Sequence, residues 1–473
     1  MTGSPDDADD GGRTSVEPIG GSADDDAAAM RRIEAALATR WPESNIDPTL
    51  ARMRAVVDLL DHPERNYPVI HVTGTNGKTT TARMIESLLR TLNLRTGRFT
   101  SPHLESYTER ISVDGKPISD ARFVGAYEEV IPYVELVDRD QPVNMSFFEV
   151  LTTMGYAAFA DAPVDVAVIE VGLGGLWDAT NVADADVAVI TPISLDHERY
   201  LGHDVGSIAA EKAGIIKPGA IAVIAEQPEA AAEAILRHAA TFEAKVLREG
   251  VDFGVLSREV AYGGQQLDLQ GLGGRYDEIF MPLFGAHQAQ NAASALTAVE
   301  AFFGVGTQRE GLDVEAVREA FASVTSPGRL EVVRRSPTVV VDAAHNPAGA
   351  AATVEGIRES FHFARIIGVV SIVQDKDAGA ILDRLEPILD EVVITENDSH
   401  RRIPAEELGQ IAVEVFGTDR VVVVPDFAAA IDRAVGLAEA DGEAAGTGVL
   451  IVGSVVTAGN ARRLLKRSRS SGT

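Results

Sequence analysis

The sequence predicts an α/β fold in two parts, an N-terminal domain with a mostly parallel sheet and a smaller, Rossmann-like C-terminal α/β domain. Its 473 residues give room for two or three domains. Short apolar runs of strand length alternate with amphipathic helical stretches along most of the chain, an order typical of parallel sheets. Hydrophobic residues make up 45% of the chain, so each domain can build its own core.

The N-terminal half contains three apolar runs that each end in a polar, glycine-containing turn. These expected strands are Val69–Val72, Val166–Ile169 and Val187–Ile190. A helix should follow the first strand, with an apolar face made of Ile85, Leu88, Leu89 and Leu92. Residues 251–283 are richer in glycine and alternate in places, as an antiparallel edge or hairpin would.

A second α/β pattern begins at Thr338. Its expected strands are Val339–Val341, Ile366–Val370, Val392–Ile394, Val421–Val424 and Val449–Val452. The segment Thr325–Arg329 separates the two patterns, and we place the domain boundary there, at Pro327. The N-terminal domain then spans residues 28–326, and the C-terminal domain spans residues 327–465.

Both ends of the chain are expected to lack packed structure. Residues 1–27 form an acidic tail of aspartates among glycines and serines, which cannot bury enough apolar surface to become ordered. Order should begin near Ala28, where apolar residues start to recur at helical spacing. Residues 466–473 are expected to be a frayed tail.

The overall charge and composition exclude several classes of partner and site. The formal charge is −29, from 71 acidic and 42 basic residues, which argues against nucleic acid and anionic membranes. The chain has no cysteine, so it has no disulfide, thiolate metal site or cysteine nucleophile. It shows neither a signal-peptide layout nor an apolar run long enough to span a bilayer. We therefore expect a cytoplasmic protein, and a monomer.

Residues 73–80, Thr-Gly-Thr-Asn-Gly-Lys-Thr-Thr, lie between an expected strand and an expected helix, which is the context of a P-loop. The glycines let the backbone curl so that its N–H groups face an anion, and the helix N-terminus adds a favourable dipole. Lys78 would reach the outer phosphates and Thr79 would offer a hydroxyl to Mg²⁺. The expected nucleotide contacts are Gly74, Thr75, Asn76, Gly77, Lys78, Thr79 and Thr80. The alternative, an ordinary βα turn, is disfavoured by the complete order of strand, turn and helix.

The loop is a variant, because Val72 stands where the general P-loop pattern has glycine. It resembles the loop of the amide-forming ligases that build peptidoglycan precursors and polyglutamylated folates. Further segments narrow the resemblance to bifunctional dihydrofolate synthase/folylpolyglutamate synthases, the folate branch of the Mur ligase superfamily. These segments are Thr100–Leu104, Glu109–Ile111, Phe147–Glu149, Ile169–Gly175, Asp178–Asn181, Leu195–His197, Glu211–Lys217, Gly328–Glu331 and Asp342–Pro347.

The resemblance implies an N-terminal P-loop ATPase domain and a reaction in two steps. A carboxylate of dihydropteroate or of a reduced folate would attack the γ-phosphate of ATP and become an acyl phosphate. L-Glutamate would then displace phosphate and form an amide, leaving ADP. Because two negative reactants must meet, cations would supply most of the electrostatic stabilisation, chiefly Mg²⁺, Lys78 and Arg329.

Two Mg²⁺ sites are implied, because the family resemblance assigns Thr79 to one and Ser101, Glu170 and His197 to another. Magnesium prefers hard oxygen ligands and usually keeps several waters. Glu170 ends an apolar strand beside the P-loop, where an acid is well placed to hold a metal. The alternatives are a solvated strand end for Glu170 and a structural histidine for His197.

Four more residues are expected near the nucleotide or in catalysis. Asp342 and His345 follow a strand of the C-terminal domain at its carboxyl end, where open α/β sheets place ligands. Arg329, at the domain boundary, resembles an arginine that reaches ATP phosphates, and Asn291 should approach the nucleotide. The rival interpretations are an Asn-Pro turn with an Asp-capped helix for 342–347, and a buried helix-face amide for Asn291.

The folate side is expected at Arg110, Phe148 and Asp178, which lie in segments that resemble the family. A pterin is a flat heterocycle that suits an aromatic face and a carboxylate. Core packing is the ordinary role of a phenylalanine such as Phe148, and only the resemblance favours the pterin. Leu176 stands where the family commonly has arginine, so one polar contact there is expected to be missing.

Lys212 is expected to be carbamylated on its ε-nitrogen. Ile208, Ile215 and Ile216 share a helical stripe with it, so the lysine should lie beside an inward-facing surface. A buried ammonium there would be costly and would repel Mg²⁺, whereas a carbamate is an anion with two oxygens. The family resemblance supports the same modification. The alternative is a solvated lysine.

Two other functions compete with this interpretation. One is a peptidoglycan-precursor ligase that adds an amino acid to a UDP-sugar peptide, although only a short segment precedes the loop here. The other is a non-catalytic nucleotide-binding switch, which would need neither a second set of metal ligands nor a second α/β domain with its own cleft residues.

Overall fold

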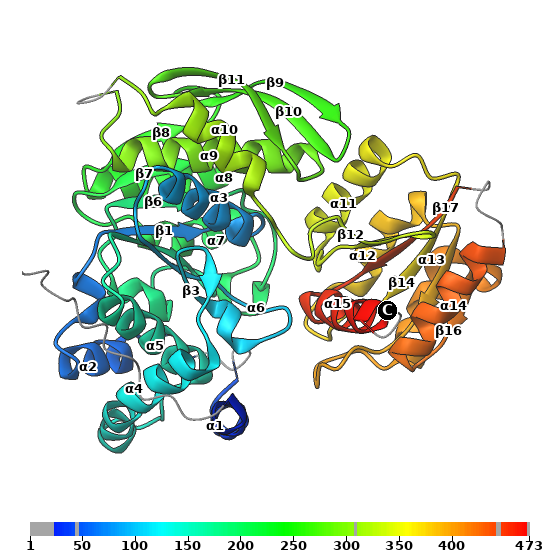
Figure 1. The fold of residues 1–473 in the computed structure, drawn as a ribbon, viewed down its shortest axis with the longest axis horizontal. Coiled ribbons are helices and arrows are strands. Elements are labelled where there is room, and N and C mark those ends of the chain that lie inside the picture. Colours follow the sequence, from blue (N-terminus) through cyan, green and yellow to red (C-terminus); the bar gives the residue numbers. More distant parts are fainter. Residues whose placement is uncertain (1–22, 43–46, 307–309, 441–445, 471–473) are drawn as a thin grey trace, which may run out of the picture.

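The computed structural model describes residues 23–42, 47–306, 310–440 and 446–470. The N-terminal part, coloured blue to yellow-green, lies beside a smaller yellow-to-red C-terminal part (Figure 1). An eight-stranded sheet and a three-stranded sheet belong to the first part, and a six-stranded sheet belongs to the second. The expected α/β fold with a mostly parallel sheet and a second α/β domain is confirmed.

The large sheet has the strand order β4-β3-β2-β5-β1-β6-β7-β8. Its strands are β1 (Val69–Thr73), β2 (Thr96–Phe99), β3 (Ile111–Val113), β4 (Lys116–Pro117), β5 (Val166–Glu170), β6 (Val187–Ile190), β7 (Ile221–Ile224) and β8 (Lys245–Arg248). Only β3 and β4 run antiparallel to their neighbours. The central strand β1 pairs with β5 and β6, with Ile70 opposite Val168 and Val187. The carboxyl ends of β1, β2, β5 and β6 therefore meet at one edge.

Helices cover both faces of the large sheet, because β1 alternates apolar residues between them. Ile70 and Val72 share a core with α3 (Lys78–Thr91), α9 (Ala286–Phe302) and α10 (Val314–Ser323). Val69 faces the other core, which contains residues of α1 (Ala23–Ala38), α2 (Ala51–Leu59), α4 (Asp120–Asp140) and α5 (Phe147–Asp161). Farther along the sheet, α7 (Val205–Lys212) and α8 (Glu229–Thr241) pack on β6 and β7.

Residues 254–281 form an antiparallel sheet of their own, where an edge or a hairpin was expected. Its strands are β9 (Gly254–Ala261), β10 (Gly264–Gly271) and β11 (Gly274–Met281), in the order β11-β10-β9. The buried residues Leu267, Leu269 and Ile279 pack into the same core as α9 and α10. The small sheet therefore caps these helices, at the top of the view (Figure 1).

The C-terminal sheet has the order β12-β13-β17-β14-β15-β16, and only β12 is antiparallel to its neighbour. Its strands are β12 (Glu331–Arg335), β13 (Thr338–Val341), β14 (Arg365–Val370), β15 (Glu391–Ile394), β16 (Val421–Val423) and β17 (Thr447–Val452). One face carries α11 (Pro347–Ser360), α12 (Ala378–Leu385) and α13 (Ala405–Phe416). The other carries α14 (Phe427–Ala440) and α15 (Val455–Ser470).

The ordered structure extends farther toward both ends than the sequence predicted. Helix α1 begins at Ala23, not near Ala28, and Asp25 and Asp26 lie in its first turn, where acidic side chains are favourable. The rest of the expected acidic tail lies outside the described residues. Helix α15 continues to Ser470, and Lys466, at the start of the expected frayed tail, bonds Glu105 at 2.7 Å. In the described parts of the chain, none of the helices combines the length and apolarity needed to cross a membrane.

Candidate active site

The P-loop connects β1 to α3 at the carboxyl edge of the large sheet, and glycine is required at two of its positions. Gly74 and Gly77 have φ of +146° and +90°. A Cβ on Gly74 would lie 1.9 Å from the hydroxyl oxygen of Thr191, and one on Gly77 would lie 2.5 Å from the amide oxygen of Asn291. The Lys78 Nζ donates to the carbonyl oxygens of Gly74 and Thr75, each at 3.2 Å. The loop is thus closely packed, with its lysine folded over it.

Asn291, from α9, was expected either to approach the nucleotide or to be a buried amide on a helix face. It is buried, and its Nδ2 donates to Oε1 of Gln288 at 3.0 Å, as a helix-face amide would. Its amide oxygen also lies against Gly77 of the P-loop. The structure therefore places Asn291 at the loop, and its contact with a nucleotide stays a prediction.

Three of the expected metal ligands come together beside the P-loop. The Thr79 hydroxyl donates to Oε1 of Glu170 at 2.7 Å, and the Ser101 backbone N–H lies 3.3 Å from Oε2. Burial raises the pKa of Glu170, because the carboxylate has lost its water. A carboxylate and two hydroxyls are hard oxygen donors that fit Mg²⁺. Among the described residues no group of three or more His, Asp and Glu side chains forms a metal site, so water would have to complete the coordination.

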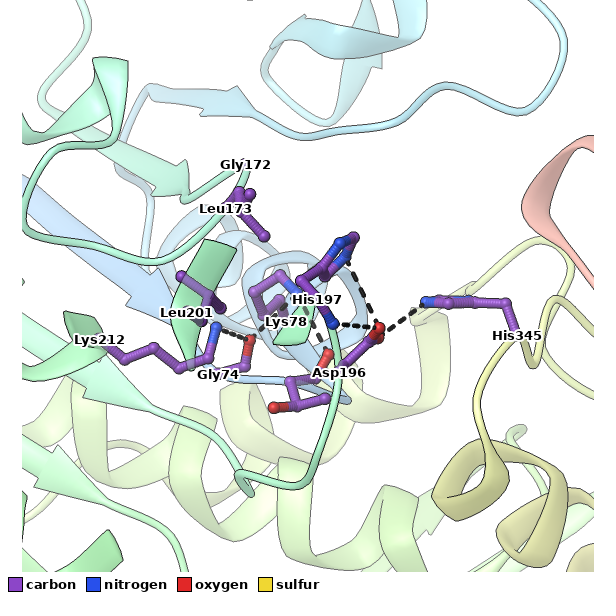
Figure 2. A pocket seen from close by; sticks show the side chains of 10 residues that line it. Gly74, Lys78, Gly172, Leu173, Asp196, His197, Leu201, Lys212 and His345 are labelled. Atoms are coloured by element: carbon purple, nitrogen blue, oxygen red, sulfur yellow. Dashed lines mark hydrogen bonds and ion pairs between the residues drawn. The ribbon is translucent and has the colours of Figure 1, made fainter. Parts of the chain in front are cut away.

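A cavity opens next to the P-loop and collects residues from both parts of the chain (Figure 2). Its lining consists of Gly74, Thr75, Lys78, Gly172, Leu173, Asp196, His197, Leu201, Lys212 and His345. We call it the lysine cavity. It brings together Lys78, Lys212 and His345, three residues that were expected to act in catalysis, Lys212 as a carbamate.

Lys212, the last residue of α7, is buried and points into the lysine cavity, not into solvent (Figure 2). Its Nζ donates to the Gly74 carbonyl oxygen at 2.8 Å. Burial and then the neighbouring charge of Lys78 lower the pKa of Lys212 to about 7. A substantial fraction of the amine is therefore neutral at physiological pH.

Asp196 is the centre of a buried polar cluster that joins the two parts of the chain. Its carboxylate accepts from the Lys376 Nζ at 2.5 Å and from Nδ2 of Asn346 at 3.0 Å. The Nε2 atom of His345 lies 3.7 Å from the same carboxylate. Burial would raise the pKa of Asp196, and the opposing effects of His197, Lys376 and His345 hold it well below its usual range. Asp196 is therefore ionised and ties the C-terminal domain to the P-loop edge.

His345 of the lysine cavity is neutral near pH 7, because burial lowers its pKa to about 4. His345 is held by an Nδ1 contact with the Ala343 carbonyl oxygen at 3.0 Å. His197 precedes the short helix α6 (Glu198–Leu201) and lies with Asp196, and no hydrogen bond or ion pair described in the structure joins it to Ser101 or Glu170. The role of His197 as a ligand of the second metal site stays a prediction.

Asp342 uses both carboxylate oxygens inside the C-terminal domain. It accepts from the backbone N–H groups of Leu330 and Ala344, both at 2.8 Å, and from the Thr353 hydroxyl at 2.9 Å. Asn346 caps α11 by accepting from the Gly349 N–H. Of the alternative that the sequence left open, the Asn-Pro turn describes the local structure, but the cap of α11 is Asn346 and not an aspartate.

Arg329 lines a second cavity, on the Thr79 side of the P-loop, which we call the arginine cavity. Its lining consists of Thr79, Arg83, Thr100, Pro102, Leu104, Glu109, Ser326, Pro327, Arg329, Ala343 and Val455. The boundary segment is fixed there because the Ser326 hydroxyl bonds the Thr80 hydroxyl at 2.8 Å. Arg329 thus reaches the P-loop helix from the start of the C-terminal domain.

The residues expected at the pterin take structural roles in the fold. Phe148 packs against Gly172, whose Cβ would lie 2.5 Å from the ring, and its ring centroid is 5.9 Å from that of Phe99. The Asp178 carboxylate accepts from the backbone N–H groups of Leu173 and Thr180, at 2.8 and 2.9 Å.

Arg110 ends the 3₁₀ helix η2 (Tyr107–Arg110), and its guanidinium lies over the ring of Phe147, 5.1 Å from the ring centroid. It is buried, and its Nε bonds Nδ1 of His103 at 3.0 Å. Leu176, at the position where the family commonly has arginine, is exposed.

Comparison with known proteins identifies the family. Residues 72–299 match the Mur ligase middle domain, and residues 328–455 match the Mur ligase glutamate ligase domain. The dihydrofolate synthase/folylpolyglutamate synthase of Mycobacterium tuberculosis is 52% identical over 480 residues, covering 97% of this chain and 98% of that protein. The chain belongs to the dihydrofolate synthase/folylpolyglutamate synthase family of Mur ligases.

Other relatives agree with this assignment. The protein of the same name from Escherichia coli is 33% identical over 410 residues, which cover 85% of this ligase and 88% of its relative. Folylpolyglutamate synthase of Mycobacterium tuberculosis complexed with ADP has a TM-score of 0.89 at 53% identity, covering 93% of this chain and 99% of that one. FolC of Escherichia coli in complex with DHPP and ADP has a TM-score of 0.81 at 31% identity, covering 94% and 99%. The resemblance seen in the motifs is confirmed, and the protein is an ADP-forming ligase.

In this ligase the contacts that Asp196 makes with the C-terminal domain were not predicted from the sequence, and neither was the cavity position of Arg83. Lys376 and Asn346 are 180 and 150 residues away along the chain, so no local pattern links them to Asp196. Arg83 lies one helical turn after Thr79. The signal available for Arg83 was its spacing of four from the P-loop threonine, which places both side chains on one helix face.

Proposed function

We propose that this ligase adds L-glutamate to dihydropteroate and to the γ-glutamyl tails of reduced folates through an acyl-phosphate intermediate. The observation that carries the proposal is the lysine cavity, where Lys78, Lys212 and His345 meet beside the P-loop. The relatives named dihydrofolate synthase/folylpolyglutamate synthase and the FolC complex with DHPP and ADP support the substrates.

The proposed chemistry follows from the charges that must meet. A substrate carboxylate attacks the γ-phosphate, its oxygen forms a bond to phosphorus, and ADP leaves. The amine of glutamate then attacks the acyl carbon, loses a proton and displaces phosphate to form an amide. Lys78 and Arg329 offset the repulsion between the anions, and neutral His345 adds no charge of its own.

The oxygens of Thr79, Ser101 and Glu170 would hold Mg²⁺, which neutralises phosphate charge when it is bound. His197 stays the proposed additional ligand of the second site. Asn291 and Arg329 are proposed nucleotide contacts because they lie against Gly77 and beside Thr79. Asp342 is proposed to act on the nucleotide side through the turn that it organises.

We propose that Lys212 carries a carbamate. The neutral amine forms a bond to the carbon of CO₂ and loses a proton, which leaves an anion in place of a cation. Burial in the lysine cavity and a pKa of about 7 support this proposal, since they favour the neutral amine that reacts. The solvated lysine that spacing alone allowed is not what the structure shows.

The pterin is proposed to bind near Phe148 and Asp178. The loop that Asp178 organises starts at Gly172 and Leu173, which also line the lysine cavity. Dihydropteroate whose pterin is held there would direct its carboxylate toward Lys78. Arg110 is proposed on the same side, through the loop it shares with His103.

A labelling experiment tests the intermediate. Substrate labelled with heavy oxygen in its carboxylate should transfer one labelled oxygen to inorganic phosphate in each turnover, because that oxygen bonds the γ-phosphorus. Phosphate that carries no label while amide is formed would exclude the acyl phosphate. A UDP-sugar peptide offered as the acceptor tests the alternative ligase, which predicts ADP formation with that substrate instead.

A further inference from the structure

Arg83 lies on α3 one turn after the P-loop residue Thr79, and both side chains line the arginine cavity. A spacing of four residues puts them on the same face of the helix. Arg329 lines the cavity from the C-terminal domain. Two guanidinium groups from different parts of the chain therefore share one space beside the P-loop.

Neither guanidinium has a hydrogen bond or ion pair in the part of the chain that the structure describes. Three carboxylates, those of Glu86, Glu109 and Glu170, raise the pKa of Arg83 through their charge. Each of them already has other partners. Glu86 binds Arg98 at 3.0 Å and the Gly115 N–H at 3.1 Å.

The other two carboxylates are engaged in the same way. Glu109 accepts from the backbone N–H groups of Leu104, Glu105 and Ser106, at 2.9 to 3.1 Å. Glu170 accepts from Thr79 and Ser101. The positive charge of Arg83 is thus not matched by a dedicated acid.

The electrostatics of the arginine cavity favour an anion. Burial lowers the pKa of Arg83 to about 10, and the neighbouring Arg98 acts in the same direction. Two arginines that line one cavity repel each other unless a negative group lies between them. A phosphate or carboxylate can accept two parallel N–H bonds from each guanidinium.

We propose that Arg83 is a nucleotide-binding residue that donates to phosphate oxygens of ATP from the arginine cavity, opposite Arg329. The P-loop hydroxyl of Thr79 forms part of the cavity wall, so an anion between the two arginines lies beside the loop. The reacting carboxylate of the acceptor belongs in the lysine cavity, with Lys212 and His345. This inference rests on the proposed function, because it takes ATP as the nucleotide.

The test compares Arg83→Met and Arg83→Lys with Arg90→Met, an exposed arginine on the same helix and outside both cavities. Calorimetric titration with ADP and with a non-hydrolysable ATP analogue gives dissociation constants without turnover. Arg83→Met should raise the dissociation constant of the ATP analogue by about tenfold or more, which is the usual effect of losing a charged hydrogen bond. Arg83→Lys should recover part of this loss, and Arg90→Met should bind as the wild type does.

Two results would overturn the inference while the wild-type enzyme still binds nucleotide and forms ADP. One is an Arg83→Met protein with wild-type melting temperature and unchanged nucleotide affinity. The other is a rise confined to KM for the acceptor, which would assign the arginine cavity to a substrate carboxylate. If Arg83→Met does not fold, Arg83→Lys decides, because a lysine cannot make the two parallel bonds and should weaken binding severalfold. A wild-type enzyme that binds no nucleotide would instead contradict the proposed function.

Discussion

Lys212 is a buried amine in a cavity that must receive anions, and its protonation state governs whether it can react with CO₂. Its pKa of about 7 means that the neutral fraction increases as the pH rises through that value. We predict that enzyme stripped of CO₂ loses activity and recovers it on addition of bicarbonate. At equal dissolved CO₂, recovery should be several times faster at about pH 8 than at about pH 6. The assay is ADP formation against time.

The variant Lys212→Ala supplies the control for this prediction. It should be inactive and partly rescued by a short-chain carboxylic acid, which restores a carboxylate at the vacated position. Lys217→Ala is a matched variant, since Lys217 bonds the carbonyl oxygens of Asn181 and Ala183 outside the cavity, and no acid should improve it. The carbamate would be excluded if bicarbonate did not change the activity of the wild-type enzyme and a short-chain acid did not restore activity to Lys212→Ala.

Substitution of Asp178 should lower turnover of dihydropteroate more than turnover of a folate. Dihydropteroate has no glutamyl tail, so it depends more on its pterin contacts. We predict that Asp178→Ala lowers kcat/KM for dihydropteroate more than for tetrahydrofolate, and destabilises the fold by about 1–3 kcal/mol because buried N–H groups lose their acceptor.

Asp186→Ala is the comparison for Asp178→Ala, because Asp186 also accepts from one backbone N–H, that of Val69, away from both cavities. It should lower the two values of kcat/KM to the same extent. An equal loss for both substrates in Asp178→Ala would place this residue outside the pterin site.

At the residue scale, sequence motifs predicted residues that lie at the P-loop, but they did not predict the residues from the other domain that contact them. Ser101 and Glu170 were predicted at one metal site and Thr79 at another, and Glu170 contacts both of the other residues. Lys376 was not predicted, because its role exists only through Asp196 in another domain. Phe148 and Asp178 were predicted at the pterin, but the contacts that they make in the structure are explained by the fold alone.

Among the elements, α15 packs tightly against a loop of the N-terminal part of the chain. A Cβ on Gly459 would lie 2.1 Å from the backbone oxygen of Leu104, in the loop that follows Ser101. We predict that Gly459→Ala destabilises the protein by about 1–3 kcal/mol, because a backbone atom cannot move aside as a side chain can. Arg462 and Lys466 of the same helix bond Glu105, so the loop is held on both sides of the contact.

A glycine with free space around it, Gly436, is the matched control, and its substitution by alanine should change the stability in the opposite direction. Gly436, inside α14, has no atom within 4 Å of the position that a Cβ would take, so Gly436→Ala should stabilise by about 0.5–1 kcal/mol. Chemical denaturation measures both changes. Equal effects of the two substitutions would show that the contact between α15 and Leu104 is not formed in solution.

The strands were the most predictable elements, because buried parallel strands appear as continuous β-branched runs. The run Val187–Ile190 forms β6 with the same limits, and the run Val69–Val72 is one residue shorter than β1. The small sheet of β9 to β11 was less predictable. Its alternation showed antiparallel pairing, but whether it joins the large sheet depends on its packing against α9, which sequence periodicity does not encode.

For the molecule as a whole, the Asp196–Lys376 pair links the two domains across the lysine cavity. Both side chains are less than a tenth exposed. We predict that Asp196→Ala lowers kcat strongly and destabilises by about 3–5 kcal/mol, because it leaves the charge of Lys376 buried without its partner. Small-angle scattering should show a larger radius of gyration. Since the pKa of Asp196 is depressed in the fold, its stabilising contribution is present at neutral pH and is lost as the pH falls below the usual aspartate range.

Asp184→Ala is the control for Asp196→Ala, because its pair with Lys217, at 3.0 Å, is mostly exposed on the aspartate side. Such a pair contributes about 0–1 kcal/mol and should leave the radius of gyration unchanged. An Asp196→Ala enzyme as compact and active as the wild type would show that closure depends on other contacts.

The most direct measurement is ADP formation by the purified enzyme with ATP, Mg²⁺ and L-glutamate, and with dihydropteroate, tetrahydrofolate or no acceptor. We predict that ADP forms with each acceptor only when glutamate is present, and that the product is the acceptor with one glutamate added. Lys78→Ala should abolish this turnover while keeping the fold, because the lysine acts on phosphate charge and bonds only two carbonyl oxygens of its own loop. ADP formation that does not depend on glutamate and acceptor, or that Lys78→Ala leaves near normal, would contradict the account.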